Sequence, residues 1–297
     1  MKHICVCVCT FKRVEYLEQL LRELGKQETA GQFSFSAVIC DNDGARSAEA
    51  LVAKIGPSLP YPVRYCVEAR QNIALARNKA IENADGDFVA FLDDDEVPVA
   101  KWLLSLFEAV NQHGADGALG PVKPRYDTAP PPWVVKGKFY DRPSYPTGFV
   151  IDWRKGRTGN VLLKTEVFNG GKELFRPEFR TGEDQDFFRR VIQNGCKFVW
   201  CEEALAYEFV PPVRWQPAFM LKRALVRGAT SLLHPTFGAK EIVKSVVAVP
   251  LYTLSLPFAL ILGQHRFMAN LVSLFDHGGR LLALMGINAV KDPYVTE

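Results

Sequence analysis

The chain has 297 residues, of which 48% are hydrophobic and 23% are charged, which is ordinary for a protein that buries a real core. Its net charge of +3 gives no argument for nucleic acid as a partner. The length allows one large domain or one domain with an appendage.

Seven cysteines are spread along the chain, and none forms a C-x-x-C pair. Cys5, Cys7 and Cys9 alternate along the first predicted strand. We predict that the cysteines are small buried apolar residues of a protein in a reducing cytoplasm. The N-terminus leads straight into that strand, so we expect no signal peptide.

The first ~115 residues alternate between predicted strands and helices. Strands are predicted at 3–9, 34–40, 63–67 and 87–92, and helices at 14–24, 47–55, 72–84 and 99–113. This alternation predicts an α/β fold with an open, mostly parallel sheet flanked by helices.

Polar clusters follow three of these strands, at 10–13, 41–43 and 93–96. In open α/β sheets, ligands bind beyond the carboxyl ends of the strands, so we expect the clusters to converge on one edge. The run Asp93-Asp94-Asp95-Glu96 places four carboxylates side by side, which a divalent cation would stabilise. The alternative is a solvated acidic turn, with Glu96 near the N-terminus of the next helix.

The second half of the chain is less regular. Residues 121–157 are rich in proline and aromatics, which predicts a functional loop or partial disorder. Six basic residues and one acid lie between 211 and 244, and the 19 residues from Ser245 to Gly263 carry no charge. Pro250 and Pro257 weaken a simple spanning helix. A buried helical subdomain and a membrane-contacting appendage, interfacial or re-entrant, both remain open.

Five segments in order resemble the inverting family 2 glycosyltransferases, which have the GT-A fold. Residues 6–13 cover the first strand with its exit, and residues 39–43 cover the end of the second strand. Residues 72–81 form the helix before the acidic run, 91–96 contain the run itself, and 181–190 contain a downstream acidic motif. Within that family the chain most resembles bacterial transferases of exopolysaccharide synthesis, including the succinoglycan type.

The resemblance implies a role for each acidic group. Asp95 would bind Mg²⁺ or Mn²⁺, with Asp93 as a second metal contact, and Asp93 and Asp94 would hold the ribose or metal-bound water. Asp184 would be the general base that activates the acceptor hydroxyl, although it could also cap the helix at 184–194. Glu183 would contact acceptor hydroxyls.

The remaining expected site residues divide between the nucleotide and the acceptor. Thr10, Arg13 and Asp41 would line the nucleoside pocket, where Asp41 would accept a hydrogen bond from uracil unless it only shapes a turn. Asn72 would face the pyrophosphate or cap its helix, and Arg77 would bind the donor or lie on the surface. Gly159 and Asn160 would border the acceptor pocket.

We therefore expect a metal-dependent inverting glycosyltransferase at the cytoplasmic face of the inner membrane. It would move a sugar from a nucleotide diphosphate sugar, most simply a UDP-sugar, to a lipid-linked or polysaccharide acceptor. The catalytic domain would span 1–235, with nucleotide and acceptor halves at 1–115 and 116–235, and an apolar helical region would span 236–297. The alternatives are a non-catalytic nucleotide-sugar or glycan-binding protein and a Mg²⁺-dependent phosphoryl transferase, although no Walker P-loop is present.

Overall fold

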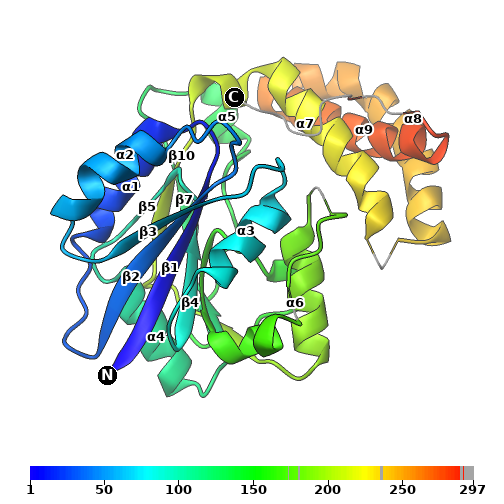
Figure 1. The fold of residues 1–297 in the computed structure, drawn as a ribbon. Coiled ribbons are helices and arrows are strands. Elements are labelled where there is room, and N and C mark those ends of the chain that lie inside the picture. Colours follow the sequence, from blue (N-terminus) through cyan, green and yellow to red (C-terminus); the bar gives the residue numbers. More distant parts are fainter. Residues whose placement is uncertain (173, 180, 235–236, 288–289, 291–297) are drawn as a thin grey trace. The chain divides into compact units, whose positions relative to one another are not determined.

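The computed structural model describes residues 1–172, 174–179, 181–234, 237–287 and 290, and the chain forms two compact units (Figure 1). The first unit comprises Met1–Lys123, Arg142–Glu178 and Glu183–Glu208, and the second comprises Pro124–Asp141, Phe179–Gly182 and Phe209–Glu297. The units divide at residues 208 and 209 rather than at the predicted boundary after residue 235. Parts of the predicted appendage, at 236, 288–289 and 291–297, lie outside the described residues.

A seven-stranded sheet forms the centre of the first unit, in the order β3-β2-β1-β4-β8-β6-β9. Its strands are β1 (Lys2–Thr10), β2 (Phe33–Asp41), β3 (Val63–Val67), β4 (Phe88–Leu92), β6 (Gly117–Leu119), β8 (Asn160–Lys164) and β9 (Phe198–Trp200). Strands β1 to β4 are parallel, whereas β8 runs antiparallel to both β4 and β6. The predicted α/β fold with a mostly parallel sheet is confirmed.

Helices cover both faces of this sheet (Figure 1). They are α1 (Val14–Leu24), α2 (Glu49–Ile55), α3 (Ile73–Glu82), α4 (Trp102–Gln112) and α6 (Glu183–Gln193). Residues of α1, α2 and α4 pack in one core cluster, and residues of α3 and α6 pack in the other.

The pattern of β1 shows why the sheet is central. Ile4, Val6 and Val8 enter one core, while Cys5 and Cys7 enter the other. Both faces of the strand are therefore buried, as in parallel sheets that are covered by helices. All seven cysteines are free, and Cys5, Cys7, Cys40 and Cys201 are buried as predicted, whereas Cys9, Cys66 and Cys196 are only partly buried.

A second sheet has three strands in the order β5-β10-β7, and these are β5 (Glu96–Pro98), β7 (Val122–Arg125) and β10 (Ala206–Phe209). Glu96 is the first residue of β5 and pairs across the ladder with Glu208. The expectation that Glu96 lies near a helix N-terminus is wrong, because the next helix, α4, begins six residues later at Trp102.

The remaining α-helices of the described residues lie in the second unit. They are α5 (Pro132–Lys136), α7 (Pro217–Thr230), α8 (Ala239–Ile261) and α9 (Gln264–Leu284). Short 3₁₀ turns occur in both units, at Gly56–Ser58, Trp153–Lys155, Thr165–Gly171, Pro212–Trp215 and Ser231–Leu233. Every candidate site residue lies in the first unit.

Candidate active site

The acidic run leaves the sheet at the carboxyl end of β4, and its four carboxylates occupy different environments. Asp94, Asp95 and Glu96 are buried, with exposed fractions of 4%, 4% and 0%. Asp93 differs, because 44% of its side chain is exposed. A solvated acidic turn, the alternative that the sequence left open, does not describe three buried carboxylates beside one that reaches solvent.

The exit of β1 provides partners for the two middle carboxylates. Thr10 Oγ1 donates to Asp94 Oδ2 at 2.8 Å, and Arg13 Nη1 lies 3.1 Å from both Asp94 Oδ1 and Asp95 Oδ2. Burial raises the pKa of Asp94 to about 7, with Arg13 opposing the shift and the charge of Asp95 adding to it. Because β1 and β4 are parallel neighbours, the structure brings these four predicted residues together at one edge.

Gly159 packs directly against the two outer members of the run. It precedes β8, whose antiparallel pairing with β4 places Asn160 opposite Leu92. A Cβ atom at Gly159 would stand 2.9 Å from Asp93 Oδ2 and 3.0 Å from Glu96 Oε1. The absence of a side chain at this position therefore lets both carboxylates approach the backbone closely.

Two residues that the sequence analysis missed, Arg142 and Glu208, lie beside Glu96. Glu208 is opposite Glu96 in the β5–β10 ladder, and Arg142 Nη2 donates to Glu208 Oε2. Glu96 Oε2 accepts from Asp93 N at 3.3 Å, whereas Glu96 Oε1 accepts no hydrogen bond from the described part of the chain. Burial raises the pKa of Glu96, and the charge of Asp93 adds to this effect.

Arg77 connects the acidic run to the start of α6. Its side chain is only 9% exposed, Nη1 donates to Glu183 Oε1, and Nη2 lies 3.6 Å from Asp93 Oδ1. Its guanidinium carbon also lies 5.6 Å from the centroid of the Phe175 ring. Burial lowers the pKa of Arg77, but Glu183 and Asp93 outweigh burial, so the pKa is raised. The alternative of an ordinary surface arginine is wrong.

Glu183 and Asp184 are the first two residues of α6, where the helix N-terminus favours negative charge. Burial raises the pKa of Glu183 to about 7, against the opposing effect of Arg77. Asp184 Oδ1 accepts from the N–H of Gln185 at 2.7 Å. Asp184 lies inside the first turn, so it does not occupy the predicted cap position. Burial also raises the pKa of Asp184, while Arg77, the Gln185 N–H and Arg157 oppose this shift.

Asp41 is fully buried at the end of β2, where its carboxylate organises the following loop. Oδ1 accepts from Asp43 N at 3.0 Å, and Oδ2 accepts from Ala48 N at 2.8 Å and from the Tyr65 hydroxyl at 2.9 Å. These contacts match the turn-shaping role that the sequence left open. The hydrogen bond from uracil to Asp41 stays a prediction.

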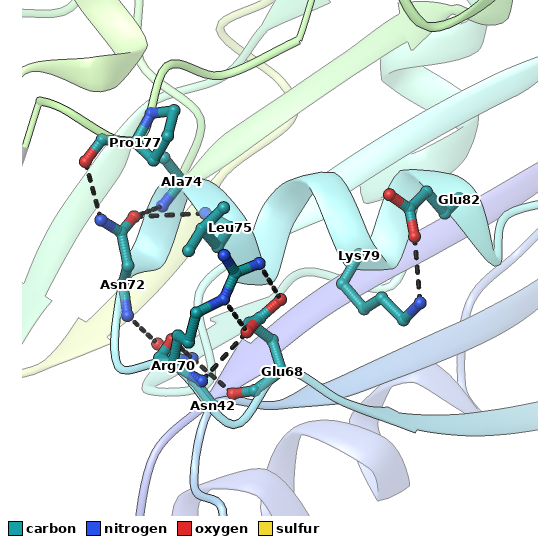
Figure 2. Close-up of polar contacts among 9 residues, drawn as sticks. All are labelled: Asn42, Glu68, Arg70, Asn72, Ala74, Leu75, Lys79, Glu82 and Pro177. Atoms are coloured by element: carbon teal, nitrogen blue, oxygen red, sulfur yellow. Dashed lines mark hydrogen bonds and ion pairs between the residues drawn. The ribbon is translucent and has the colours of Figure 1, made fainter.

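Asn72 caps α3, as Figure 2 shows. Its Oδ1 accepts from the N–H groups of Ala74 and Leu75 at 2.9 and 3.2 Å, and its Nδ2 donates to the Pro177 carbonyl at 2.8 Å. Asn42 Oδ1 accepts from the N–H of Asn72 at 2.9 Å. The cap alternative is therefore confirmed, and the contact of Asn72 with a pyrophosphate stays a prediction.

Asn160 has a structural role instead of the predicted role beside the acceptor. Its side chain is buried, Nδ2 donates to the carbonyls of Pro121 and Ala204 at 3.0 and 2.7 Å, and Oδ1 accepts from Trp102 Nε1 at 2.7 Å. Both N–H groups and the amide oxygen are thus engaged by protein atoms. We correct this prediction, and of the pair only Gly159 borders the carboxylates.

We expect Asn160→Ala to lower the free energy of unfolding by about 2–4 kcal/mol, because it leaves several buried polar groups unpaired. Denaturant unfolding followed by circular dichroism measures the change. Asn111→Ala, at an exposed position of α4, is the matched control. An Asn160→Ala variant as stable as this control would contradict the structural role.

Within the described residues, no group of three or more His, Cys, Asp or Glu side chains is arranged to hold a metal ion. The carboxylates of Asp93 and Asp95 nevertheless fit a hard divalent cation, since Mg²⁺ and Mn²⁺ prefer oxygen ligands. Mg²⁺ is commonly held by one or two carboxylates, with water and substrate phosphates completing its coordination. The unpaired, buried Glu96 Oε1 adds another carboxylate oxygen to the same run.

The sequence matches a family model and several known proteins. The sequence model of glycosyl transferase family 2 matches residues 5–170. The chain is 35% identical to the succinoglycan biosynthesis protein ExoM of Rhizobium meliloti (strain 1021) over 230 residues, which are 77% of this chain and 74% of that protein. It is 23% identical to chondroitin synthase of Escherichia coli over 70% of this chain, but it covers only 35% of that longer protein.

Solved structures share the fold. S. aureus TarS 1-349 in complex with UDP has a TM-score of 0.56 at 17% identity, covering 98% of this chain and 94% of that one. GalNAc-T7 with UDP, GalNAc and Mn²⁺ has a TM-score of 0.54 at 13% identity, covering 73% of this chain and 45% of that one. At these identities the likeness shows the fold alone, and it confirms the predicted GT-A architecture.

Proposed function

Because the chain belongs to glycosyl transferase family 2, we propose that it moves a sugar from a UDP-sugar to a lipid-linked or polysaccharide acceptor, with inversion at the anomeric carbon. The observation that carries this proposal is the position of Arg77. One buried guanidinium lies between Asp93 of the acidic run and Glu183, which is adjacent to Asp184 at the start of α6. The groups proposed for the donor and for the acceptor are therefore neighbours.

Asp184 is the general base in this proposal. It takes the proton from the acceptor hydroxyl as that oxygen attacks the anomeric carbon, a contribution of about 10²–10⁴ in rate. A single in-line displacement then converts an α-linked donor into a β-linked product. Arg77 holds Glu183 and keeps positive charge close to Asp184, which favours the ionised base.

Asp93 and Asp95 are the proposed ligands of Mg²⁺ or Mn²⁺, and Asp94 holds the ribose or metal-bound water. When bound, the cation supplies Lewis-acid stabilisation of the diphosphate leaving group. Thr10 and Arg13 fix the conformation of Asp94 and Asp95 at the edge of the sheet. Two observations support this assignment, the burial of Asp95 and the close approach of Gly159 to Asp93.

The choice of donor and acceptor is supported by the related proteins. TarS 1-349 has been solved in complex with UDP and with UDP-GlcNAc, and ExoM takes part in succinoglycan biosynthesis. We therefore assign the chain to bacterial cell-surface glycan synthesis, at the cytoplasmic face of the inner membrane. An amphiphilic, lipid-linked acceptor would be found at that surface.

A panel of nucleotide sugars tests the proposal. Purified full-length protein is incubated with Mn²⁺ or Mg²⁺ and with UDP-, GDP-, ADP- or CDP-linked sugars, and donor hydrolysis and transfer are followed by mass spectrometry. We expect turnover of a UDP-sugar that stops when EDTA is added. Tight UDP-sugar binding without turnover, in the presence of membrane extract as a source of acceptor, would favour a non-catalytic binding protein instead.

The pH dependence of kcat/KM tests the base. Because Asp184 acts only when deprotonated, and burial raises its pKa above the ordinary value of 3.8, we expect activity to be lost on acidification at a pH above that value. Arg157 lowers this pKa, so Arg157→Gln should move the acidic limb to higher pH. Arg154→Gln, on an exposed side chain of the same segment, is the control. An acidic limb at the same pH in Arg157→Gln and wild type would contradict the assignment of that limb to Asp184.

A further inference from the structure

Helix α8, the second-last helix of the described chain, buries only two small residues and exposes many of its large apolar ones. Its buried residues are Ser245 and Ala259. By contrast, Leu254, Phe258 and Ile261 are 71%, 69% and 84% exposed. A helix at the surface of a water-soluble protein has the opposite arrangement, with its apolar stripe facing the core.

Of the eight large apolar side chains of α8 that are exposed, seven share one face, and Leu260 lies outside it. We call these seven the α8 stripe, and they are Val243, Val246, Val247, Leu251, Leu254, Phe258 and Ile261. Their spacing of three, four and seven residues places them along one side of the helix. Pro250 and Pro257 have the same spacing and lie on this side, and α8 is continuous through both. The stripe runs for much of a helix of 23 residues, which is about 34 Å long.

The opposite face of α8 packs on α9 through polar contacts. Ser245 Oγ lies 3.0 Å from His277 Nδ1, and Arg280 Nη1 donates to the same hydroxyl at 3.0 Å. Farther along, Asn270 Nδ2 donates to Ser255 Oγ at 2.9 Å. Polar groups, the Tyr252 ring and Ala259 thus lie on the side of α8 that faces α9, while the largest exposed apolar groups face outward, an arrangement that suits a lipid environment better than water.

Helices α7 and α9 approach each other through glycines. A Cβ atom at Gly228 would stand 1.9 Å from the Asp276 carbonyl oxygen, and one at Gly279 would stand 2.4 Å from the Leu225 carbonyl oxygen. Glycine at these two positions lets the backbones of α7 and α9 meet directly, which fixes α9 to α7.

Charges around the stripe favour a bilayer surface over a spanning helix. Lys240 and Lys244 are exposed at the start of α8, and Arg266 is exposed just after its end. These cations can reach lipid headgroups at both ends of the stripe. By length and hydropathy alone α8 could cross a membrane. If α8 crossed the membrane, α9, which packs on α8, and α7, which packs on α9, would also enter the hydrocarbon. They would bring the ion pair of Arg227 and Asp276, at 2.7 Å, into a medium where burying charges is costly.

We propose that α8 lies in the plane of the membrane and inserts the α8 stripe into one leaflet of an anionic bilayer, while α7 and α9 stay outside the hydrocarbon. This inference rests on the membrane location in the proposed function and adds the surface and the orientation. It places α8 among interfacial helices, which bind through apolar area and basic residues.

Vesicle sedimentation tests the surface. We expect the full-length protein to bind vesicles of equal parts phosphatidylglycerol and phosphatidylcholine more tightly than vesicles of phosphatidylcholine alone. Leu254→Glu combined with Phe258→Glu should weaken binding to the anionic vesicles by at least about tenfold. The control combines Val135→Glu with Leu233→Glu, which makes the same charge change at exposed apolar positions outside α8 and should bind like wild type.

Three outcomes would overturn the inference. They are wild-type protein that does not bind vesicles, equal binding by wild type and the stripe variant, and self-association in light scattering that covers the stripe in place of lipid. UDP-sugar hydrolysis without vesicles is measured on the same preparations and should be unchanged in the stripe variant. Loss of hydrolysis in wild type would contradict the proposed function, whereas loss of vesicle binding alone would contradict only the membrane surface.

A cysteine at the start of α9, three residues after the end of α8, tests the orientation. In the in-plane arrangement, Gln264→Cys stays on the side from which the protein was added, so a membrane-impermeant maleimide should label it in bound protein. Peptide mass spectrometry separates this site from the native cysteines. Protection of the Gln264→Cys thiol in bound protein, with labelling restored by detergent, would show that the chain just after α8 enters or crosses the bilayer and would overturn the in-plane orientation.

Discussion

Asp184→Asn is expected to reduce sugar transfer by about 10²–10⁴ while UDP binding stays near the wild-type value. The amide is nearly isosteric with the carboxylate, so it preserves the shape of the α6 N-terminus. It cannot accept the acceptor proton, because its nitrogen is not basic. Transfer is measured by mass spectrometry and UDP binding by calorimetry with Mn²⁺.

The comparison of binding with rate separates a catalytic role from a structural one. Asp141→Asn changes an exposed carboxylate in the same way and should leave both quantities unchanged. If Asp184→Asn lost UDP binding and transfer in equal proportion, the residue would be holding the fold or the donor, and its assignment as the base would be wrong.

Asp95→Ala should remove the metal-dependent part of UDP binding, by about 100-fold or more. Mutation of residues that contact a metal ligand typically lowers metal affinity by about 10–100-fold, and loss of a direct ligand should cost at least as much. The side chain is buried beside Asp94 and Arg13, so its removal also takes one ion-pair partner away from Arg13. Calorimetry with and without Mn²⁺ measures the effect.

Folding and metal binding must be distinguished in this variant. Circular dichroism and the unfolding midpoint show whether Asp95→Ala keeps its structure, and Asp141→Ala is the control for loss of an exposed carboxylate. If UDP binding by Asp95→Ala depended on Mn²⁺ as strongly as UDP binding by wild type does, Asp95 would be excluded as a metal ligand.

The gathering of polar residues at the edge of the sheet could be predicted, because it depends on local sequence patterns. Apolar strands that end in polar clusters, separated by helical periodicity, predict parallel neighbours whose carboxyl ends meet. Thr10, Arg13, Asp94 and Asp95 therefore come together as expected. The cap formed by Asn72 was also among the predicted alternatives, because asparagine before a helix is a recognised signal.

Other parts of the site depend on long-range pairing. The environment of Glu96 depends in part on Glu208, which is 112 residues away and lies opposite it in the antiparallel β5–β10 ladder. Asn160 follows Gly159 directly, yet the Asn160 side chain is hydrogen-bonded in the core while Gly159 packs against the acidic run. No local pattern distinguishes two such neighbours, because their roles depend on strands and loops that are distant in sequence.

The reversed direction of β8 has a consequence for how this site can diverge between related enzymes. Because β8 begins beside the end of β4, the segment at 142–158, which precedes β8, arrives at the same edge of the sheet. This segment contributes Arg142 and Arg157 to the electrostatic surroundings of Glu96 and Asp184. The carboxylate run and its partners in β1 are encoded separately, before residue 97. Substitutions, insertions or deletions in 142–158 can therefore alter one wall of the site while the other wall keeps its sequence. Under the proposed function, acceptor preference would then change without loss of donor binding.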